Sequence, residues 1–439
     1  MRAPSCYDGG RGNRMTGVEM MRTGGRDARD EAGRGTRGVT RRGLVASLAA
    51  ATAAPLLAGC SLISGAGPSG EAEAPRFQLA TVFDSEPAST SATLMMVGDM
   101  LIHTSVWKSG ARPDGTYNYD HFFANLADEF SGADISMVNQ ETILGGTEHG
   151  LEDFPYFNSP QELGDAEVKA GVDVAVSATN HALDHGFDGI CWTLDYWHGT
   201  HPEVVVPGIA ATEEEALEPK IVERNGIKVA IVSYTEITNL LSPPADKRWC
   251  LNILRDADIA ADVARARGAG ADIVVACPHW GTEYVYRPDD AQPRWASDFV
   301  DAGVDAIIGT HPHVLQPVEL LEGPDGRRVP VFWSLGNFVS SQIEKPRMVG
   351  GMAKLTFEKG PEGARVTGYS LTPLVTHRAL GTDMSVYRLS DYTEELAARN
   401  YVRNAEGCGD FTAAYCRDLA SQILGEGYDP EACVLTGTL

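Results

Sequence analysis

Basic residues are scarce in this chain of 439 residues, which has 36 Lys and Arg against 60 Asp and Glu and a formal net charge of −24. Proteins that bind nucleic acid cluster positive charge on one face, so this balance argues against a nucleic-acid partner. The sequence G-x-x-x-x-G-K-[ST] is also absent. Without that phosphate-binding loop, we do not expect the chain itself to power an ATP-dependent ligase step.

Hydrophobic runs of membrane-spanning length are lacking as well. The uncharged stretch 43–59 has 17 residues, many of them Ala, and is marginal for a membrane span. Arginines precede it, and it ends L-A-G-C at Cys60, which resembles a bacterial lipobox. We therefore expect 1–60 to be a signal peptide whose Cys60 is lipidated, and 61–91 to be a flexible tether. The mature protein would be anchored at the extracytoplasmic face of the cell membrane.

Cysteine is infrequent, with eight residues in all. Six lie after residue 60, and outside the cytoplasm an even count permits disulfides. Cys408, Cys416 and Cys433 lie near the C-terminus, so a bond within that group is open. Cys277 lies in an apolar run and is expected to be a core residue.

Short apolar runs recur from residue 93 onward and are typical of buried strands. They are L-M-M-V (94–97), I-S-M-V (135–138), V-A-V-S (174–177), V-A-I-V-S (229–233), I-V-V-A-C (273–277) and A-I-I-G (306–309). Helices are expected between them, at 119–130, 160–170, 255–267 and 288–302, with a hairpin turn at Asn225-Gly226. This alternation predicts an α/β domain, layered α-β-β-α, over 92–377, followed by a mostly helical extension at 378–439.

Polar side chains of the types that bind metal follow five of these runs. In α/β sheets, ligands and catalytic groups collect at the carboxyl ends of the strands. We therefore expect these residues to converge: Asp99, His103, Asn139, Glu141, Asn180, His181, Asp184, His185, His279, Glu283, His311 and His313. The other histidines lack this context and are expected to be structural or exposed: His121, His149, His198, His201 and His377.

The two histidines of the G-T-H-P-H turn fit a metal pair particularly well. Imidazole is a ligand for Zn, Fe or Mn, a carboxylate can bridge two ions, and paired ions activate water for in-line attack. His311 and His313 could each send one imidazole to one ion. Each residue alone has an ordinary alternative, since Asp99 could be a turn residue and Asn180 a helix N-cap. Their joint placement favours a site for two divalent ions, Mn, Zn or Fe.

Several motifs also occur in an order known from one protein family. They are G-D-M-L-I-H, V-N-Q-E-T, F-N-S-P, A-T-N-H-A-L-D-H-G, H-W-G-T-E-Y, G-T-H-P-H-V-L-Q-P-V-E and W-S-L-G-N-F-V. As an ordered set over 93–377, they resemble the CapA family of poly-γ-glutamate capsule biosynthesis proteins. That family is similar to calcineurin-like metallophosphoesterases. The resemblance therefore implies a four-layer α-β-β-α sandwich around a dinuclear metal centre.

The resemblance also implies which residues hold metal. The implied ligands are Asp99, His103, Glu141, Asn180, His279, His311 and His313. Two features depart from the phosphoesterase pattern. Three residues separate Asp99 from His103 where one is usual, and Glu141 stands where the bridging residue is usually Asp. Phosphoesterase activity therefore does not follow from the fold.

Other residues are assigned to catalysis and substrate binding by the same resemblance. His181 would be a general acid or would stabilise charge in the transition state, and Asp184 belongs to the same catalytic group. The expected pocket residues are Asn139, Trp280, Glu283 and Asn337. For Trp280, core packing is an equal alternative.

Two functions are compatible with these features. The first is a lipid-anchored, metal-dependent hydrolase of capsule biosynthesis, acting on a phosphoester or, as a second choice, an amide. The second is a non-catalytic accessory protein that binds polymer or metal. The expected partners are the membrane, the capsular polymer and membrane-bound synthase subunits. Bound metal in the isolated protein would separate the two functions.

Overall fold

A computed structural model of the chain describes residues 89–379 and 384–439. The predicted signal peptide, the lipidation site Cys60 and nearly all of the predicted tether fall outside these residues. Strand β1 (Thr90–Met100) begins just before the predicted domain start at residue 92. None of the helices within the described ranges is long and apolar enough to cross a membrane.

The larger sheet has nine strands in the described residues, in the order β14-β15-β12-β11-β1-β2-β3, with β10 paired to β1 and β13 to β12. Its other strands are β2 (Ile135–Asn139), β3 (Val174–Val176), β10 (Asn337–Val339), β11 (Val349–Gly360), β12 (Gly363–Arg378), β13 (Met384–Arg388), β14 (Tyr428–Asp429) and β15 (Val434–Thr438). Strands β1, β2 and β3 are parallel, so their carboxyl ends share one edge of the sheet.

The smaller sheet has six strands, in the order β4-β5-β6-β7-β9-β8. They are β4 (Ile221–Arg224), β5 (Ile227–Thr235), β6 (Ile273–His279), β7 (Ala306–Ile308), β8 (Val318–Glu322) and β9 (Arg328–Phe332). Strands β5, β6, β7 and β9 are parallel. All six apolar runs predicted as strands fall in strands, and Asn225-Gly226, both with positive φ, forms the predicted turn between β4 and β5.

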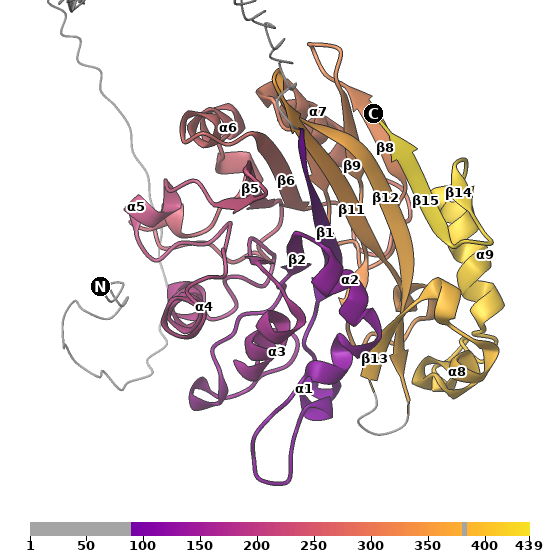
Figure 1. The fold of residues 1–439 in the computed structure, drawn as a ribbon. Coiled ribbons are helices and arrows are strands. Elements are labelled where there is room, and N and C mark those ends of the chain that lie inside the picture. Colours follow the sequence, from indigo (N-terminus) through magenta and orange to yellow (C-terminus); the bar gives the residue numbers. More distant parts are fainter. Residues whose placement is uncertain (1–88, 380–383) are drawn as a thin grey trace, which may run out of the picture. The chain divides into compact units, whose positions relative to one another are not determined.

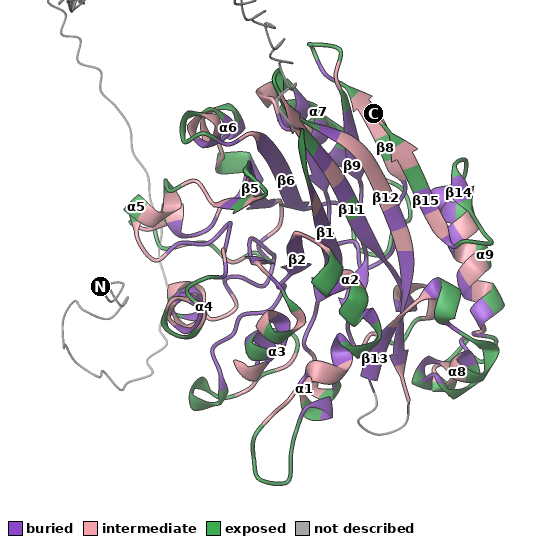
Figure 2. Cartoon of the chain, in the orientation of Figure 1, coloured by how far each residue is buried: buried purple, intermediate pink, exposed green. Residues whose placement is uncertain are grey.

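Alternation of side chains along the strands divides the interior into layers. On β1, Leu94 and Met96 join the apolar cluster between the sheets, whereas Met95 and Val97 join a second cluster under helices. Strand β6 alternates between the first cluster and a third one in the same way. Figure 2 shows central strands such as β1, β2 and β6 buried over most of their length, whereas the edge strands β8 and β15 are mostly intermediate or exposed and the helices expose one side. The predicted four-layer α-β-β-α order is confirmed.

Most helices of the described residues lie on the outer faces of the two sheets, whereas the two C-terminal ones contribute to the cluster between the sheets (Figure 1). The helices are α1 (Thr104–Ser109), α2 (Ala127–Gly132), α3 (Glu162–Ala170), α4 (Gly186–Thr200), α5 (Glu213–Ala216), α6 (Ile259–Gly268), α7 (Gln292–Ala302), α8 (Glu394–Arg399) and α9 (Ala413–Leu424). Helices α1 to α4 supply the cluster on the larger sheet, and α6 and α7 supply the one on the smaller sheet.

Helix starts lie later than the sequence predicted. The segment 119–130 forms two 3₁₀ turns before α2 begins. Helix α3 begins at Glu162 rather than at residue 160, and Ser159 does not cap it. Instead, the Ser159 hydroxyl shares a hydrogen bond with the Thr142 hydroxyl (2.8 Å). The backbone N–H of Ser159 donates to the carbonyl of Ile143.

The C-terminal part is more than the predicted helical extension. Strands β13 and β15 both pair with β12, and β12 itself contains the boundary predicted after residue 377. Buried residues of α8 and α9, such as Ala397 and Cys416, join the cluster between the sheets. The sequence V-L-T-G-T of β15 has no continuous apolar run, which explains why the sequence pattern missed it.

The six cysteines of the described residues are all buried. No disulfide joins Cys408, Cys416 and Cys433 in this part of the chain. Cys277 packs in the cluster between the sheets, as its apolar run predicts.

Helix α3 carries a glutamate, Glu167, whose carboxylate lies in the protein interior. Glu167 is fully buried, and neither of its carboxylate oxygens has a hydrogen-bond partner within the described residues. Burial raises the pKa of Glu167 well above its usual value, so the folded protein favours the neutral acid. The stability that this protonation contributes is fully present below the pKa of Glu167 in the unfolded chain. It is lost as the pH rises through the pKa of Glu167 in the folded protein.

We expect Glu167→Gln to stabilise the fold at pH 8 by about 1–3 kcal/mol, because the amide needs no proton to be neutral. The gain should shrink towards pH 4, where the wild-type carboxyl is protonated in both states. Thermal melts across this pH range would measure it, with Glu162→Gln on the same helix as control. A gain that is the same at pH 4 and pH 8 would contradict this account.

Candidate metal centre

The site lies at the shared edge where parallel strands of both sheets end. Asp99 is near the end of β1, Asn139 ends β2 and His279 ends β6. All three are buried. The Asn139 Nδ2 group donates to Asp99 Oδ1 (2.9 Å) and lies 3.4 Å from His279 Nδ1, so the amide links the two sheets.

The H-P-H turn follows β7 and is held in an unusual backbone conformation. His311 has φ 99° and His313 has φ 57°, values that side-chain-bearing residues rarely adopt. Close packing fixes the turn, since a Cβ on Gly309 would lie 2.3 Å from the Trp333 carbonyl oxygen. Such strain persists where the surrounding structure imposes it, and here it directs two imidazoles into one buried space.

Glu141 lies where the histidines converge. Its carboxylate, His279 and His311 offer ligand atoms within 4.8 Å of one another, and so do Asp99, Glu141 and His313. Glu141 belongs to both groups, whereas His311 and His313 divide between them. A third group of the same size joins Glu283, His311 and His313.

Asparagines and a threonine orient these histidines. His279 Nε2 lies 2.9 Å from Asn180 Oδ1 and 3.2 Å from His311 Nδ1, while Nδ1 of His279 faces the Thr310 hydroxyl at 3.0 Å. His313 Nδ1 lies 3.0 Å from both Asp99 Oδ2 and Asn337 Oδ1. Such partners fix ring orientation in metal sites.

The protonation of the histidines suits metal binding in part. Burial, together with the neighbouring imidazoles, lowers the pKa of His279 and His311 well below the usual value, so both rings are neutral with a free lone pair. His313 differs: burial alone lowers its pKa, but Glu141 and Asp99 raise it to about 9. In the metal-free chain, His313 therefore carries the positive charge that a cation would replace.

The surroundings of the Glu141 carboxylate indicate whether a metal ion fits this site. Glu141 is 1% exposed, and neither carboxylate oxygen accepts a hydrogen bond within the described residues. Its Oε1 atom is 3.6 Å from His313 Nε2 and 3.7 Å from His279 Nε2. Burial raises the pKa of Glu141 well above its usual value, against the pull of His313. A buried carboxylate ringed by imidazoles fits a divalent transition metal, which would satisfy both oxygens.

His181 and Asp184 form a separate pair beside these groups. His181 Nδ1 lies 2.7 Å from Asp184 Oδ2, and the same oxygen accepts the Phe157 N–H at 2.7 Å. The Phe157 ring packs edge-on against His181, with centroids 4.7 Å apart. The carboxylate therefore fixes the imidazole, with Nε2 as the ring atom able to reach a substrate.

Not every predicted residue joins the ligand groups. His103 belongs to none of the three, and its Nδ1 atom lies 3.2 Å from the Leu101 carbonyl oxygen. Burial lowers its pKa to about 4. Trp280 is a core residue, stacked on Trp333 and donating to that residue's carbonyl oxygen at 3.0 Å. His185 lies outside the groups too, 3.7 Å from Glu152.

Comparison with known sequences identifies the family. The model for "Bacterial capsule synthesis protein PGA_cap" matches residues 93–342, more than half of the chain. The chain belongs to this PGA_cap family. The predicted CapA relationship is thereby confirmed, and the match covers every residue predicted to hold metal.

Curated relatives of this PGA_cap protein include proteins named for PGA, capsule or polyglutamine synthesis. PGA biosynthesis protein CapA of Bacillus subtilis (strain 168) is 31% identical over 204 residues, which is 46% of this chain and 50% of the relative. Capsule biosynthesis protein CapA of Bacillus anthracis is 28% identical over 265 residues, 57% and 60% of the two chains. A probable polyglutamine synthesis accessory protein of Mycobacterium tuberculosis is 25% identical over 223 residues, 48% and 57%. The chain thus spans about half the length of the curated relatives it matches.

Solved structures with some likeness include two nucleotidases. NAD nucleotidase of Haemophilus influenzae has a TM-score of 0.41 at 14% identity, covering 66% of this chain and 56% of that one. A putative 5′-nucleotidase of Staphylococcus aureus also has a TM-score of 0.41 at 14% identity, with 68% and 54% covered. At this level of likeness, we take neither ligand nor activity from them.

The sequence reasoning missed several residues of the PGA_cap site. Phe157 stands in the F-N-S-P motif, from which no role for its ring can be predicted. Asn239, with φ 49°, places its side chain 3.4 Å from Asn180 and 3.5 Å from His181. Tyr284, with φ 67°, faces the His313 ring at 6.1 Å and carries the Arg347 guanidinium 3.5 Å above its own ring. The pair N-L at 239–240 carried no recognisable signal, because only the fold brings it to the site.

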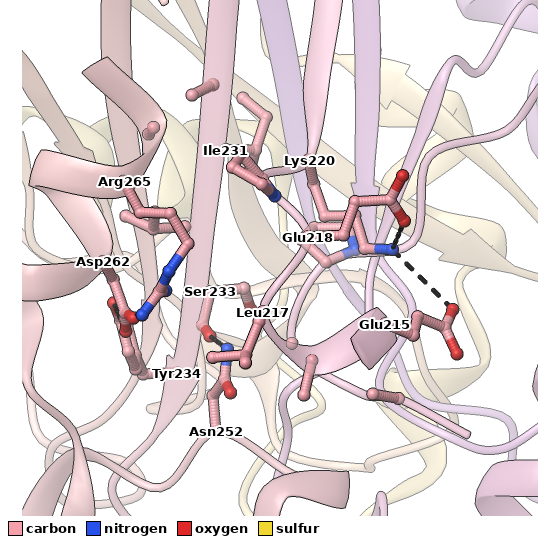
Figure 3. Close-up of a pocket in the computed structure, with 18 of the residues that line it drawn as sticks. Glu215, Leu217, Glu218, Lys220, Ile231, Ser233, Tyr234, Asn252, Asp262 and Arg265 are labelled. Carbon is pink, nitrogen blue, oxygen red and sulfur yellow. Dashed lines mark hydrogen bonds and ion pairs between the residues drawn. The ribbon is translucent and has the colours of Figure 1, made fainter. Parts of the chain in front are cut away.

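A separate pocket lies among α5, β5 and α6 (Figure 3). Tyr234 donates to Asp262 there at 2.8 Å, and Lys220 pairs with Glu215 and Glu218. Its lining includes none of the predicted site residues. Its acidic groups are paired with Lys220 and Arg265, so the metal groups at the strand ends remain the candidate site.

Proposed function

We propose that this PGA_cap protein is a hydrolase acting on a phosphoester in capsular polymer biosynthesis, and that the two ligand groups sharing Glu141 would hold two divalent metal ions. The observation that carries the proposal is the Glu141 carboxylate, buried without a hydrogen bond between two overlapping ligand groups. One group would hold an ion through Asp99 and His313, and the other through His279 and His311. The Asn180 amide oxygen is placed to complete the second group.

The proposed chemistry divides between the ions and the chain. When bound, two divalent ions would supply Lewis acidity to an attacking water and to a substrate oxygen. His181 would donate a proton from Nε2 to the leaving-group oxygen. Asp184 holds the ring through Nδ1, and the Phe157 ring limits its rotation and keeps water from its edge. Neutral His279 and His311 leave their lone pairs available to metal.

A non-catalytic role is the second candidate. It is favoured by the name of the Mycobacterium tuberculosis relative, a probable accessory protein of polyglutamine synthesis, and by the absence of an ATP-binding loop in this sequence. In that role, the site would bind metal or polymer while membrane-bound subunits carry out polymerisation. The two candidates differ in one measurable property, which is turnover by the metal-loaded protein.

Metal content tests the proposal first. We expect the full chain to hold about two transition-metal equivalents, as a two-metal site requires, and to hydrolyse members of a phosphoester panel. The double variant His311→Ala, His313→Ala should lose both metal and hydrolysis. Glu141→Gln should lose most of the metal, because the amide bridges two cations poorly. Elemental mass spectrometry gives the count.

The control is Glu152→Gln, an exposed glutamate outside the ligand groups, which should retain full metal content. A wild-type chain that binds no Mn, Zn or Fe after reloading would refute the metal centre. Bound metal without turnover of any phosphoester or γ-glutamyl amide would favour the accessory role.

The proposed proton donor predicts a specific kinetic loss. We expect His181→Asn to lower kcat on the best phosphoester by about 10²- to 10⁴-fold, the usual contribution of general acid catalysis, with metal content and KM nearly unchanged. His201→Asn is a matched control, because His201 also lies 2.7 Å from an aspartate, Asp165. An unchanged kcat in His181→Asn would remove His181 from the mechanism.

We further propose that Cys60 is lipidated and anchors the protein at the extracytoplasmic face of the membrane. The support is the sequence L-L-A-G-C after an uncharged stretch. Cells given labelled palmitate should incorporate the label into the wild-type chain and not into Cys60→Ala. Equal labelling of both chains would contradict lipidation at this residue.

A further inference from the structure

Glu283 stands apart from the other acidic residues of the site because it is exposed. Its loop follows β6 and is tied to the H-P-H turn by two backbone hydrogen bonds, Trp280 N–H to the Thr310 carbonyl (3.1 Å) and Tyr284 N–H to the Pro312 carbonyl (2.8 Å). The left-handed backbone of Tyr284 turns the chain at this point. Glu283 is therefore held at the mouth of the site while its side chain remains accessible to water.

The two histidines of the turn each belong to two ligand groups. Both share a group with Glu141 at the bottom of the site, and both share the third group with Glu283 at its mouth. An ion bound by either imidazole can thus also reach the Glu283 carboxylate. Because Glu141 occupies the bottom of the site, Glu283 would have to bind the same ion from the solvent side.

Burial makes these two carboxylates unequal as ligands. Glu141 is 1% exposed and its carboxylate has no hydrogen-bond partner within the described residues, so releasing it from a cation would leave a buried charge without a partner. Glu283 returns to water when released, at little cost. A metal ligand whose release costs little free energy can be replaced by another anion.

Charge favours such a replacement. Two divalent ions with Asp99 and Glu141 leave a net charge of about +2 in the site, and a bound Glu283 lowers it to about +1. A phosphoryl group seeks the same positive field from the same open side. Glu283 and the phosphoryl group would therefore compete for one position.

We propose that Glu283 is an exchangeable ligand of the metal pair, bound when substrate is absent and displaced by the phosphoryl group of the substrate. This inference rests on the proposed dinuclear site and assigns the substrate's point of entry. In this account, Glu283 occupies the position of the substrate's phosphoryl group when substrate is absent, instead of only lining the pocket. Its loss should weaken metal retention and strengthen phosphate binding.

The test uses the full chain loaded with Co²⁺, comparing wild type, Glu283→Gln and the charge-matched control Glu152→Gln. We expect Glu283→Gln to release metal to a chelator about 10- to 100-fold faster, the range typical of altered metal surroundings. It should bind inorganic phosphate more tightly in calorimetry. Its visible cobalt absorption should also change, because cobalt bands report the number of ligands. Glu152→Gln should match wild type in all three measurements.

The outcomes separate this inference from the proposed function. If wild type holds two ions and Glu283→Gln matches it in release rate, phosphate affinity and cobalt spectrum, Glu283 is not a ligand and the inference is overturned. If both Glu283→Gln and Glu152→Gln shift alike, only net charge matters, and the inference also fails. If wild type holds no metal at all, the dinuclear site fails and the inference falls with it. Unchanged melting of the variants would verify folding, as expected for exposed side chains.

Discussion

The burial of the Glu141 carboxylate is the constraint on which the rest of the site depends. A carboxylate without hydrogen bonds costs several kcal/mol in a protein interior unless a cation or a proton neutralises it. This cost is reflected in two pKa shifts: the pKa of Glu141 is raised above its usual value, and the pKa of His313 is raised so that its imidazole is charged. Every other group at the strand ends is arranged around that carboxylate. The neutral imidazoles, the amide links and the strained turn are consistent with a space built for positive charge.

The fold turns this local constraint into a meeting of two sheets. Asp99 and Asn139 come from the larger sheet, and His279 comes from the smaller one. The cluster between the sheets fixes their distance, so the ligands are positioned by apolar packing and not by flexible loops. The H-P-H turn has an unfavourable backbone, with positive φ at both histidines, and close packing around Gly309 holds it in place. Stability stored in the core thus maintains a geometry that the turn would not adopt alone.

Sequence reasoning found what is periodic and what is chemically conspicuous. The six apolar runs and the polar residues after them were sufficient to predict the layers and to bring Asp99, Glu141 and His279 to one edge. Long antiparallel strands such as β11 were missed, because alternating sequences like M-A-K-L-T-F-E-K show only one buried face. The metal-binding role of His103 stays a prediction, because its Nδ1 atom faces the Leu101 carbonyl and the residue joins none of the three ligand groups. Asn239 could not be found, since its position depends entirely on tertiary contacts.

Strand order also governs when the site can come into being during synthesis. Strand β1 lies between β2 and β11, and Asp99 is in register with Asn337 of β10. The ribosome makes β1 more than two hundred residues before β10 and β11, so Asp99 must wait for most of the chain before its neighbours exist. A nascent chain that stops short of β11 has carboxylates and histidines but no enclosed place for a cation. Metal held at the proposed centre would therefore be acquired only after β10 and β11 have been made.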